Sequence, residues 1–144
     1  MSKVSLTNFL IGFFLIFISA SSGAFLANEI SIKYISENNI LDSWSSLIQK
    51  SAHGHTNLFA IIHICFGLTF PYSVANKLVK KLQTVGLFLG SFAMSVLMMV
   101  RSFYPPVSQT DYLGFIIGIF LSAALVALLT HMLGIGIRYL RFQD

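Results

Sequence analysis

The chain has 144 residues, of which 56% are hydrophobic and only 10% are charged, and its mean hydropathy is +0.80. Because a water-soluble domain carries about 25% charged residues, this composition excludes a soluble globular protein and predicts one embedded in lipid. The net charge is +4, but Lys and Arg lie at the ends of apolar runs, which argues against nucleic acid binding. The single cysteine, Cys65, excludes an internal disulfide and a Cys-x-x-Cys redox pair.

Four apolar runs are long enough to cross a membrane as helices. A hydrocarbon core of about 30 Å takes about 20 helical residues. The runs cover residues 5–27, 53–72, 82–100 and 112–139. We therefore predict an all-α membrane protein in which residues 1–144 form a single domain, a bundle of four transmembrane helices.

The first run begins with a short basic segment and ends near small residues at 19–24, a pattern similar to a secretory signal peptide. The apolar run continues through Phe25 and Leu26. We therefore expect this helix to be retained as a span.

The distribution of Lys and Arg predicts the orientation. Six of them fall on one side of the four spans, at Lys3, Lys77, Lys80, Lys81, Arg138 and Arg141, and three fall on the other side, at Lys33, Lys50 and Arg101. Cytoplasmic loops carry the excess of positive charge. Both termini should therefore be cytoplasmic, and the size and orientation favour a bacterial inner membrane.

The loop between the first two spans contains apolar residues at helical spacing, namely Ile40, Leu41, Trp44, Leu47 and Ile48. This pattern predicts a short amphipathic helix on the outer membrane surface, with Trp44 at the interface. A flexible loop with chance periodicity is the alternative.

Small residues predict where the spans pack, because lipid gives no hydrophobic drive to helix association. Gly86 and Gly90 form such a pair on the third span, and Gly114 and Gly118 form one on the fourth. A strip of alanines extends the second pair, at Ala123, Ala124 and Ala127.

Ionisable residues inside a membrane mark a function by default, and the four histidines all fall in the second and fourth runs. His53 and His55 are two residues apart, which places them about 200° apart on a helix, on opposite faces. His63 lies deeper, and His131 lies near the cytoplasmic end. As alternatives, His53 and His55 are solvated residues at a helix start, and His63 and His131 are hydrogen-bonded packing residues.

His63 and His131 are unsuited to hold one haem between them. The second and fourth runs cross in the same direction, and helical rise places His63 about 15 Å and His131 about 28 Å below the outer end. Axial ligands of one haem need nearly equal depth. The mismatch of about 13 Å therefore argues against this pair within one chain.

The start of the second run, Ala52-His53-Gly54-His55, resembles a helix of the haem-copper oxidase superfamily, and it looks most like that of the nitric oxide reductase large subunit. The resemblance implies that His53 matches the ligand of a high-spin haem and His55 the ligand of a low-spin haem b. The family has many more spans than four, and the three histidines that hold its second metal have no counterpart here. The resemblance therefore implies a b haem, and we do not expect the chain to be an enzyme on its own.

Arg101 closes the third run on the outer side, at the level of His53 and His55. Its guanidinium group suits a haem propionate or another anion, since arginine binds carboxylates in a bidentate manner. The alternative is an arginine that extends its head group to the membrane surface.

Three functions remain open. The first is a haem b protein that serves electron transfer or a respiratory complex, with His53, His55, His63, His131 and Arg101 as candidate cofactor contacts. The second is a non-catalytic accessory or scaffold subunit. The third is a small transporter or metal-handling protein that binds Zn²⁺ or Cu²⁺ through His53, His55 and His63. The expected partners are the lipid bilayer and either a second copy of the chain or other membrane subunits.

Overall fold

The computed structural model describes residues 1–37, 44–105 and 111–142, and these ranges are almost entirely helical. The elements are α1 (Lys3–Glu37), α2 (Trp44–Thr69), the 3₁₀ turn η1 (Phe70–Tyr72), α3 (Lys77–Phe92), the π-helical turn η2 (Ala93–Leu97), α4 (Met98–Phe103) and α5 (Tyr112–Arg141). No strand occurs in these ranges. The prediction of an all-α helical bundle is confirmed.

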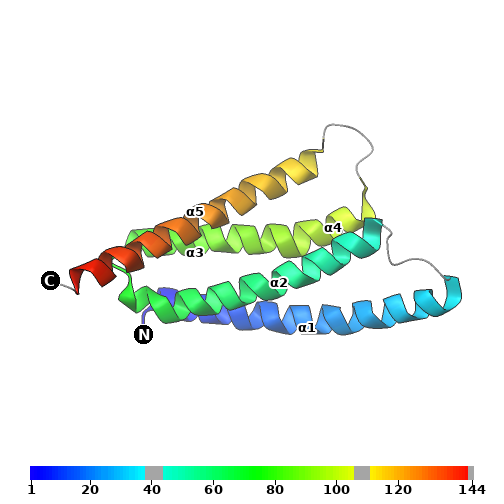
Figure 1. Cartoon of the computed structure of the whole chain (residues 1–144), viewed down its shortest axis with the longest axis horizontal. Helices are drawn as coiled ribbons and strands as arrows, with labels where there is room; N and C mark the ends of the chain where they lie inside the picture. The colour runs from blue at the N-terminus through cyan, green and yellow to red at the C-terminus, as the bar shows by residue number, and fades with distance from the viewer. Residues whose placement is uncertain (38–43, 106–110, 143–144) are drawn as a thin grey trace.

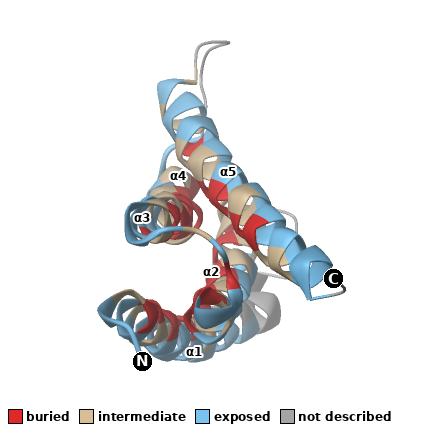
Figure 2. Cartoon of the chain, turned by 90° about the vertical axis from the view of Figure 1, so that its left-hand side faces the viewer, coloured by how far each residue is buried: buried red, intermediate tan, exposed pale blue. Residues whose placement is uncertain are grey.

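The helices run up and down in chain order, so both ends of the chain lie at the same end of the bundle (Figure 1). α1 packs along α2, α3 packs along α5, and α2 also contacts α4 and η2. Viewed end-on, the buried residues face the middle of the bundle and the exposed residues face outward (Figure 2). α2 therefore joins the two helix pairs.

Among the described residues, three helical segments are long and apolar enough to cross a membrane, namely Lys3–Asn28, Lys77–Phe103 and Tyr112–Arg141. α2 has 26 residues, about 39 Å by helical rise, but its first half is rich in polar residues. The prediction of membrane-crossing helices is therefore met by three segments, and the fourth span stays a prediction.

The outer segment differs from its prediction. Ile40 and Leu41 lie outside the described residues, and Trp44, Leu47 and Ile48 belong to the first turns of α2 instead of a separate helix. The Trp44 indole N–H donates to the carbonyl of Arg101 at 3.1 Å. This bond ties the start of α2 to α4.

The third span is one helix from Lys77 to Phe103 with a π-helical turn in its middle. Asn76 caps its start, because its side-chain oxygen accepts from Val79 N at 2.9 Å. A π-helical turn inserts an extra residue and is frequent near functional sites. Here the turn brings buried Ala93 and Met94 to the face of the bundle interior.

The predicted small-residue contact is present on α3. A Cβ on Gly86 would lie 2.8 Å from the carbonyl oxygen of Ala123, and a Cβ on Gly90 would collide with the Cβ of Ala124. On α5 the alanine strip makes the contact. Among the described residues, a Cβ on Gly118 would meet nothing within 4 Å, so the prediction that this glycine packs against another of these helices was wrong.

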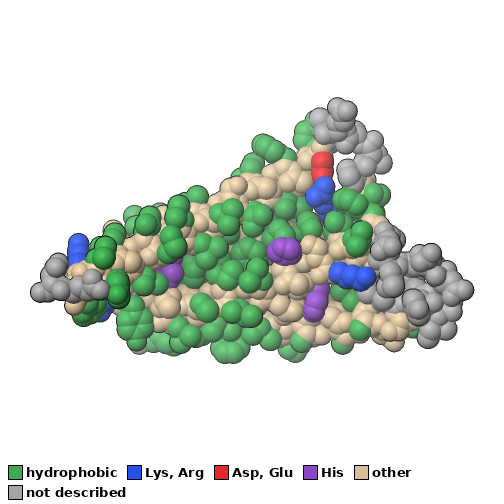
Figure 3. All heavy atoms as spheres, in the orientation of Figure 1, with side chains coloured by type: hydrophobic (Ala, Val, Ile, Leu, Met, Phe, Trp, Pro, Cys, Tyr) green, Lys and Arg blue, Asp and Glu red, His purple; other side chains and the backbone are tan. Residues whose placement is uncertain are grey.

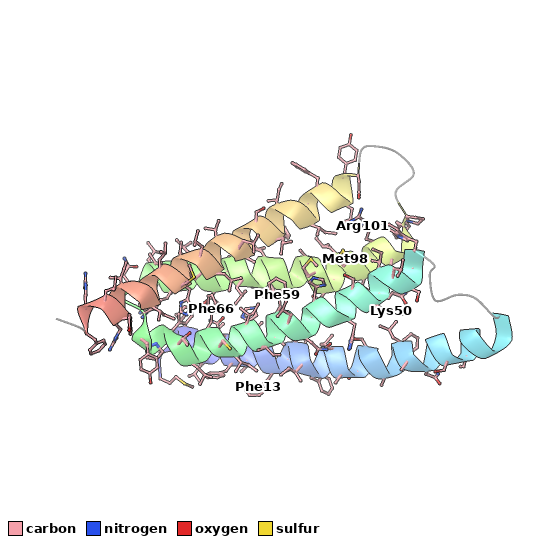
Figure 4. The ribbon with its side chains drawn as sticks, viewed as in Figure 1. Phe13, Lys50, Phe59, Phe66, Met98 and Arg101 are labelled. Atoms are coloured by element: carbon pink, nitrogen blue, oxygen red, sulfur yellow. The ribbon has the colours of Figure 1, made fainter. Side chains whose placement is uncertain are left out.

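Large apolar side chains cover the sides of the molecule, and Lys and Arg gather toward its ends (Figure 3). Phe13 is 61% exposed and points away from the bundle, whereas Phe59 and Phe66 point into it (Figure 4). This is the surface expected of a protein whose surroundings are lipid.

Candidate functional site

His55 lies near the middle of α2 (Trp44–Thr69) and presents one free ring nitrogen. Its Nδ1 lies 2.8 Å from the carbonyl oxygen of Ser51. A carbonyl oxygen only accepts, so Nδ1 carries the proton and donates. Nε2 makes no hydrogen bond with the described residues and keeps its lone pair available. A histidine held in this way is oriented as a metal-ligating histidine is.

The side of α2 that carries His55 faces α3 and α5. His55 is about 40° from Phe59 and about 20° from Phe66 around the helix axis. The Phe59 ring lies 3.2 Å from the position that a Cβ on Gly90 of α3 would occupy. The Phe66 ring stacks on His131 of α5 at 4.2 Å. His55 therefore projects toward the seam between α2 and the α3–α5 pair.

His53 faces the opposite helix. Its Nδ1 lies 3.1 Å from the Ser19 hydroxyl of α1, and its Nε2 accepts from the Asn57 amide nitrogen at 3.4 Å. The ring also fills the space beside Gly23, since a Cβ there would lie 2.6 Å from a ring carbon. Both nitrogens of His53 are thus engaged within the chain, on the face that the helical period predicts.

His63 is fully buried between α1, α2 and α3. Its Nδ1 lies 2.8 Å from the Asn8 side-chain oxygen, and its Nε2 lies 3.0 Å from the Ser91 hydroxyl. The Asn8 amide nitrogen donates to the Val4 carbonyl at 2.9 Å and to the Thr84 hydroxyl at 2.8 Å. The Val4 bond fixes the orientation of the amide, so Nδ1 of His63 is the donor to Asn8.

Thr84 donates to the Lys80 carbonyl at 3.0 Å. The Ser91 hydroxyl lies 3.0 Å from Nε2 of His63 and 2.8 Å from the Leu87 carbonyl, and its single proton goes to Nε2 when Nδ1 donates to Asn8. Three helices are joined by side chains that satisfy one another in an apolar interior. A second partner for His63 would have to displace one of these bonds, which favours a structural role for this residue.

His131 joins α5 to α2. Its Nε2 lies 2.7 Å from the Thr69 hydroxyl, which itself donates to the Cys65 carbonyl at 2.6 Å. The ring stacks on Phe66 at 4.2 Å and meets Phe70 edge-on at 5.0 Å, while Nδ1 is buried without a hydrogen bond. His131 lies beside Thr69, about 9 Å along α2 from His63. The two histidines are at different levels of the bundle.

Arg101 forms an ion pair with Asp111, whose carboxylate also accepts from Gly114 N at the start of α5. The guanidinium group lies 5.3 Å from the centre of the Trp44 ring. The anion beside Arg101 is therefore a carboxylate of the chain itself. α2, α4 and α5 meet at this end of the bundle, where Figure 4 places Arg101 and Lys50.

The two roles of Asp111 are separable. We expect Asp111→Ala to lower the free energy of unfolding by about 1–2 kcal/mol, because the change removes both the helix cap and a partly exposed ion pair. Asp111→Asn should cost less than about 1 kcal/mol, since asparagine still caps a helix. Thermal unfolding of both variants in detergent checks this, and equal losses would contradict a capping role.

Within residues 1–37, 44–105 and 111–142, no group of three or more His, Cys, Asp and Glu lies close enough to hold a metal ion. His53 and His55 serve different sides of α2, and His63 is bonded at both nitrogens. The three histidines do not converge on one point in the described part of the chain.

The sequence reasoning missed the partners of His63. Asn8 is a strongly polar residue inside the apolar helix α1, and a buried amide without a partner is costly in lipid. That cost was the signal for an interhelical bond. It did not reveal that the bond would run to His63 and Thr84.

Comparison with known proteins found no matching family model, no curated protein and no solved structure with significant similarity.

Proposed function

We propose that the chain is a small integral membrane protein in which α1, α2, the α3–α4 helix and α5 each cross the bilayer, with both termini cytoplasmic. Three segments have the length and hydropathy of spans. α2 is long enough and packs against the other helices, which bury its polar residues Ser46, Thr56 and His63. The end that holds both termini also holds six of the nine Lys and Arg residues, and the positive-inside rule supports a cytoplasmic location for this end. The small size and this orientation favour a bacterial inner membrane.

We further propose that this protein binds b-type haem with His55 as an axial ligand. The observation that carries the proposal is the Nδ1–H bond from His55 to the Ser51 carbonyl, which leaves Nε2 available. In His53 and His63 the Nε2 atom is hydrogen-bonded within the chain. In His131 the Nε2 atom is hydrogen-bonded and the Nδ1 atom is buried. The local resemblance of residues 52–55 to a haem-ligand helix agrees with this choice.

The residues fit one axial ligand per chain, so the second ligand comes from a second copy of the chain or from another membrane subunit. A bound b haem supplies one-electron transfer. The chain's own part is to hold the His55 ring by its Nδ1–H bond and to provide apolar walls at the seam of α2 with α3 and α5. This role is electron transfer, on its own or within a respiratory complex.

An accessory or scaffold subunit is the second candidate. It is favoured by the buried network of His63, Asn8 and Ser91, in which each side chain serves to join helices. A transporter or metal-handling role through His53, His55 and His63 is the third, and it would need ligands from outside the described residues.

The test is an optical spectrum of the detergent-purified protein, air-oxidised and then reduced with dithionite, with haem and metal analysis of the same sample. We expect a b-type spectrum that His55→Ala abolishes and that His53→Asn retains. One haem per two chains indicates a site shared between copies. A colourless wild-type protein from haem-replete cells, or haem that survives in His55→Ala, would overturn the assignment, and copurifying subunits would then favour the accessory role.

A further inference from the structure

A groove runs between α2 and α5 in the half of the bundle that holds the termini. It has a volume of about 360 Å³ and is lined mainly by apolar side chains, among them Ile62, Phe66, Leu128, Met132 and Ile135. Met132 is 61% exposed, so the groove opens to the lipid side of the molecule. Its shape and lining suit a hydrocarbon chain.

A basic pocket of about 210 Å³ lies one helical turn beyond this groove. It is lined by Val74, Arg138, Arg141 and Phe142. Ile135 and Arg138 are three residues apart on α5, about 4.5 Å by helical rise. Leu128, Met132, Ile135, Arg138 and Phe142 follow one another at spacings of four, three, three and four residues. The groove and the pocket therefore lie along one stripe of α5.

Arg138 of this pocket is held in place by contacts that involve no carboxylate of the described residues. The Arg138 Nη1 donates to the Pro71 carbonyl at 3.0 Å, and its guanidinium lies 5.3 Å from the centre of the Phe142 ring and 6.0 Å from that of Tyr72. Lys80 is close enough to Arg138 for their like charges to interact. Within the described residues, the one ion pair is at the opposite end, between Arg101 and Asp111.

We propose that this stripe binds an anionic phospholipid, with an acyl chain in the groove and the phosphate in the basic pocket. Arginine binds phosphate in a bidentate manner, and basic pockets at the cytoplasmic ends of spans take anionic head groups. Tyr72, whose ring lies 6.0 Å from the Arg138 guanidinium, is of a residue type enriched at the membrane interface. Figure 3 places Lys and Arg side chains at this end, next to apolar ones. The groove and the basic pocket do not include His55, so lipid binding here does not depend on whether the protein binds haem.

The proposal differs from a general attraction between positive charge and an anionic membrane. Lys77 and Lys81 are exposed on α3 and line neither the groove nor the basic pocket. A general attraction depends on the number of charges, so it would weaken equally when either pair is neutralised. In a specific lipid-binding site, the affinity depends on the two arginines that line the pocket, Arg138 and Arg141.

The experiment measures lipid binding by native mass spectrometry and by the shift of Tm in detergent. The probes are a phosphatidylglycerol and a phosphatidylcholine with identical acyl chains. The full chain is compared with Arg138→Gln/Arg141→Gln and with the charge-matched Lys77→Gln/Lys81→Gln. A third variant, Met132→Trp, fills the groove and leaves both arginines in place. Circular dichroism and gel filtration establish that each variant is folded.

We expect the wild type to retain phosphatidylglycerol in preference to phosphatidylcholine. The arginine variant should bind it about 30-fold more weakly, the effect of two basic residues beside an anionic group, while the lysine variant keeps most of the affinity. Met132→Trp should also weaken binding. Equal binding of the two lipids, or equal losses in the arginine and lysine variants, would overturn the proposal.

Discussion

Replacing Gly90 with leucine is expected to separate α3 from α5 and to lower the free energy of unfolding by about 3 kcal/mol. A Cβ at this position would collide with the Cβ of Ala124 and would lie 3.2 Å from a ring carbon of Phe59. The Cβ of Ala124 is fixed to the backbone of α5, so only movement of a whole helix can relieve the overlap. Packing between close helices is a main source of stability where lipid gives no hydrophobic drive.

Gly118→Leu is the matched control for this prediction. It makes the same change in another span, at a glycine whose Cβ would meet no atom of the described part of the chain within 4 Å. We expect it to alter the free energy of unfolding by less than about 0.5 kcal/mol. The measurement is unfolding in mixed detergent micelles with increasing dodecyl sulfate, followed by circular dichroism. A comparable loss in both variants would mean that the α3–α5 contact is not the one described.

The position of each apolar run could be read from the sequence, but helix ends could not. Hydropathy falls after Ala27, yet α1 continues to Glu37, because backbone hydrogen bonds sustain a helix beyond the part suited to lipid. The second run was expected to start at His53, but α2 begins at Trp44. An apolar run in the sequence indicates which residues lie in the lipid. The ends of a helix depend instead on capping residues and on contacts with other helices, which hydropathy does not reveal.

The histidines illustrate the same limit at the candidate site. The helical period placed His53 and His55 on different faces of α2, and in the structure His53 contacts Ser19 of α1 whereas His55 bonds to Ser51 within α2. The partners of these residues come from segments distant in the chain. Periodicity on one helix cannot specify Ser19 for His53 or Thr69 for His131, because those pairs depend on which helices are neighbours.

His63→Leu is expected to lower the free energy of unfolding by about 2 kcal/mol, since it leaves the Asn8 side-chain oxygen buried without its donor. Asn8→Leu alone should have a similar cost, because it leaves Nδ1 of His63 without an acceptor. In the double variant both groups are gone together. We therefore expect its loss to be well below the sum of the two single losses, with a coupling of about 1 kcal/mol, within the range for hydrogen bonds between membrane helices.

The same variants separate the structural role of His63 from a role in haem binding. If His55 holds the haem, folded His63→Leu protein should keep the b-type spectrum and the haem content of the wild type while it unfolds at lower denaturant. Strictly additive losses in the cycle would show that Asn8 and His63 are not partners. Loss of the spectrum in folded His63→Leu protein would instead make His63 a ligand. The bond to Asn8 would then do for His63 what the bond to the Ser51 carbonyl does for His55: it would hold the proton on Nδ1 and leave Nε2 to bind iron.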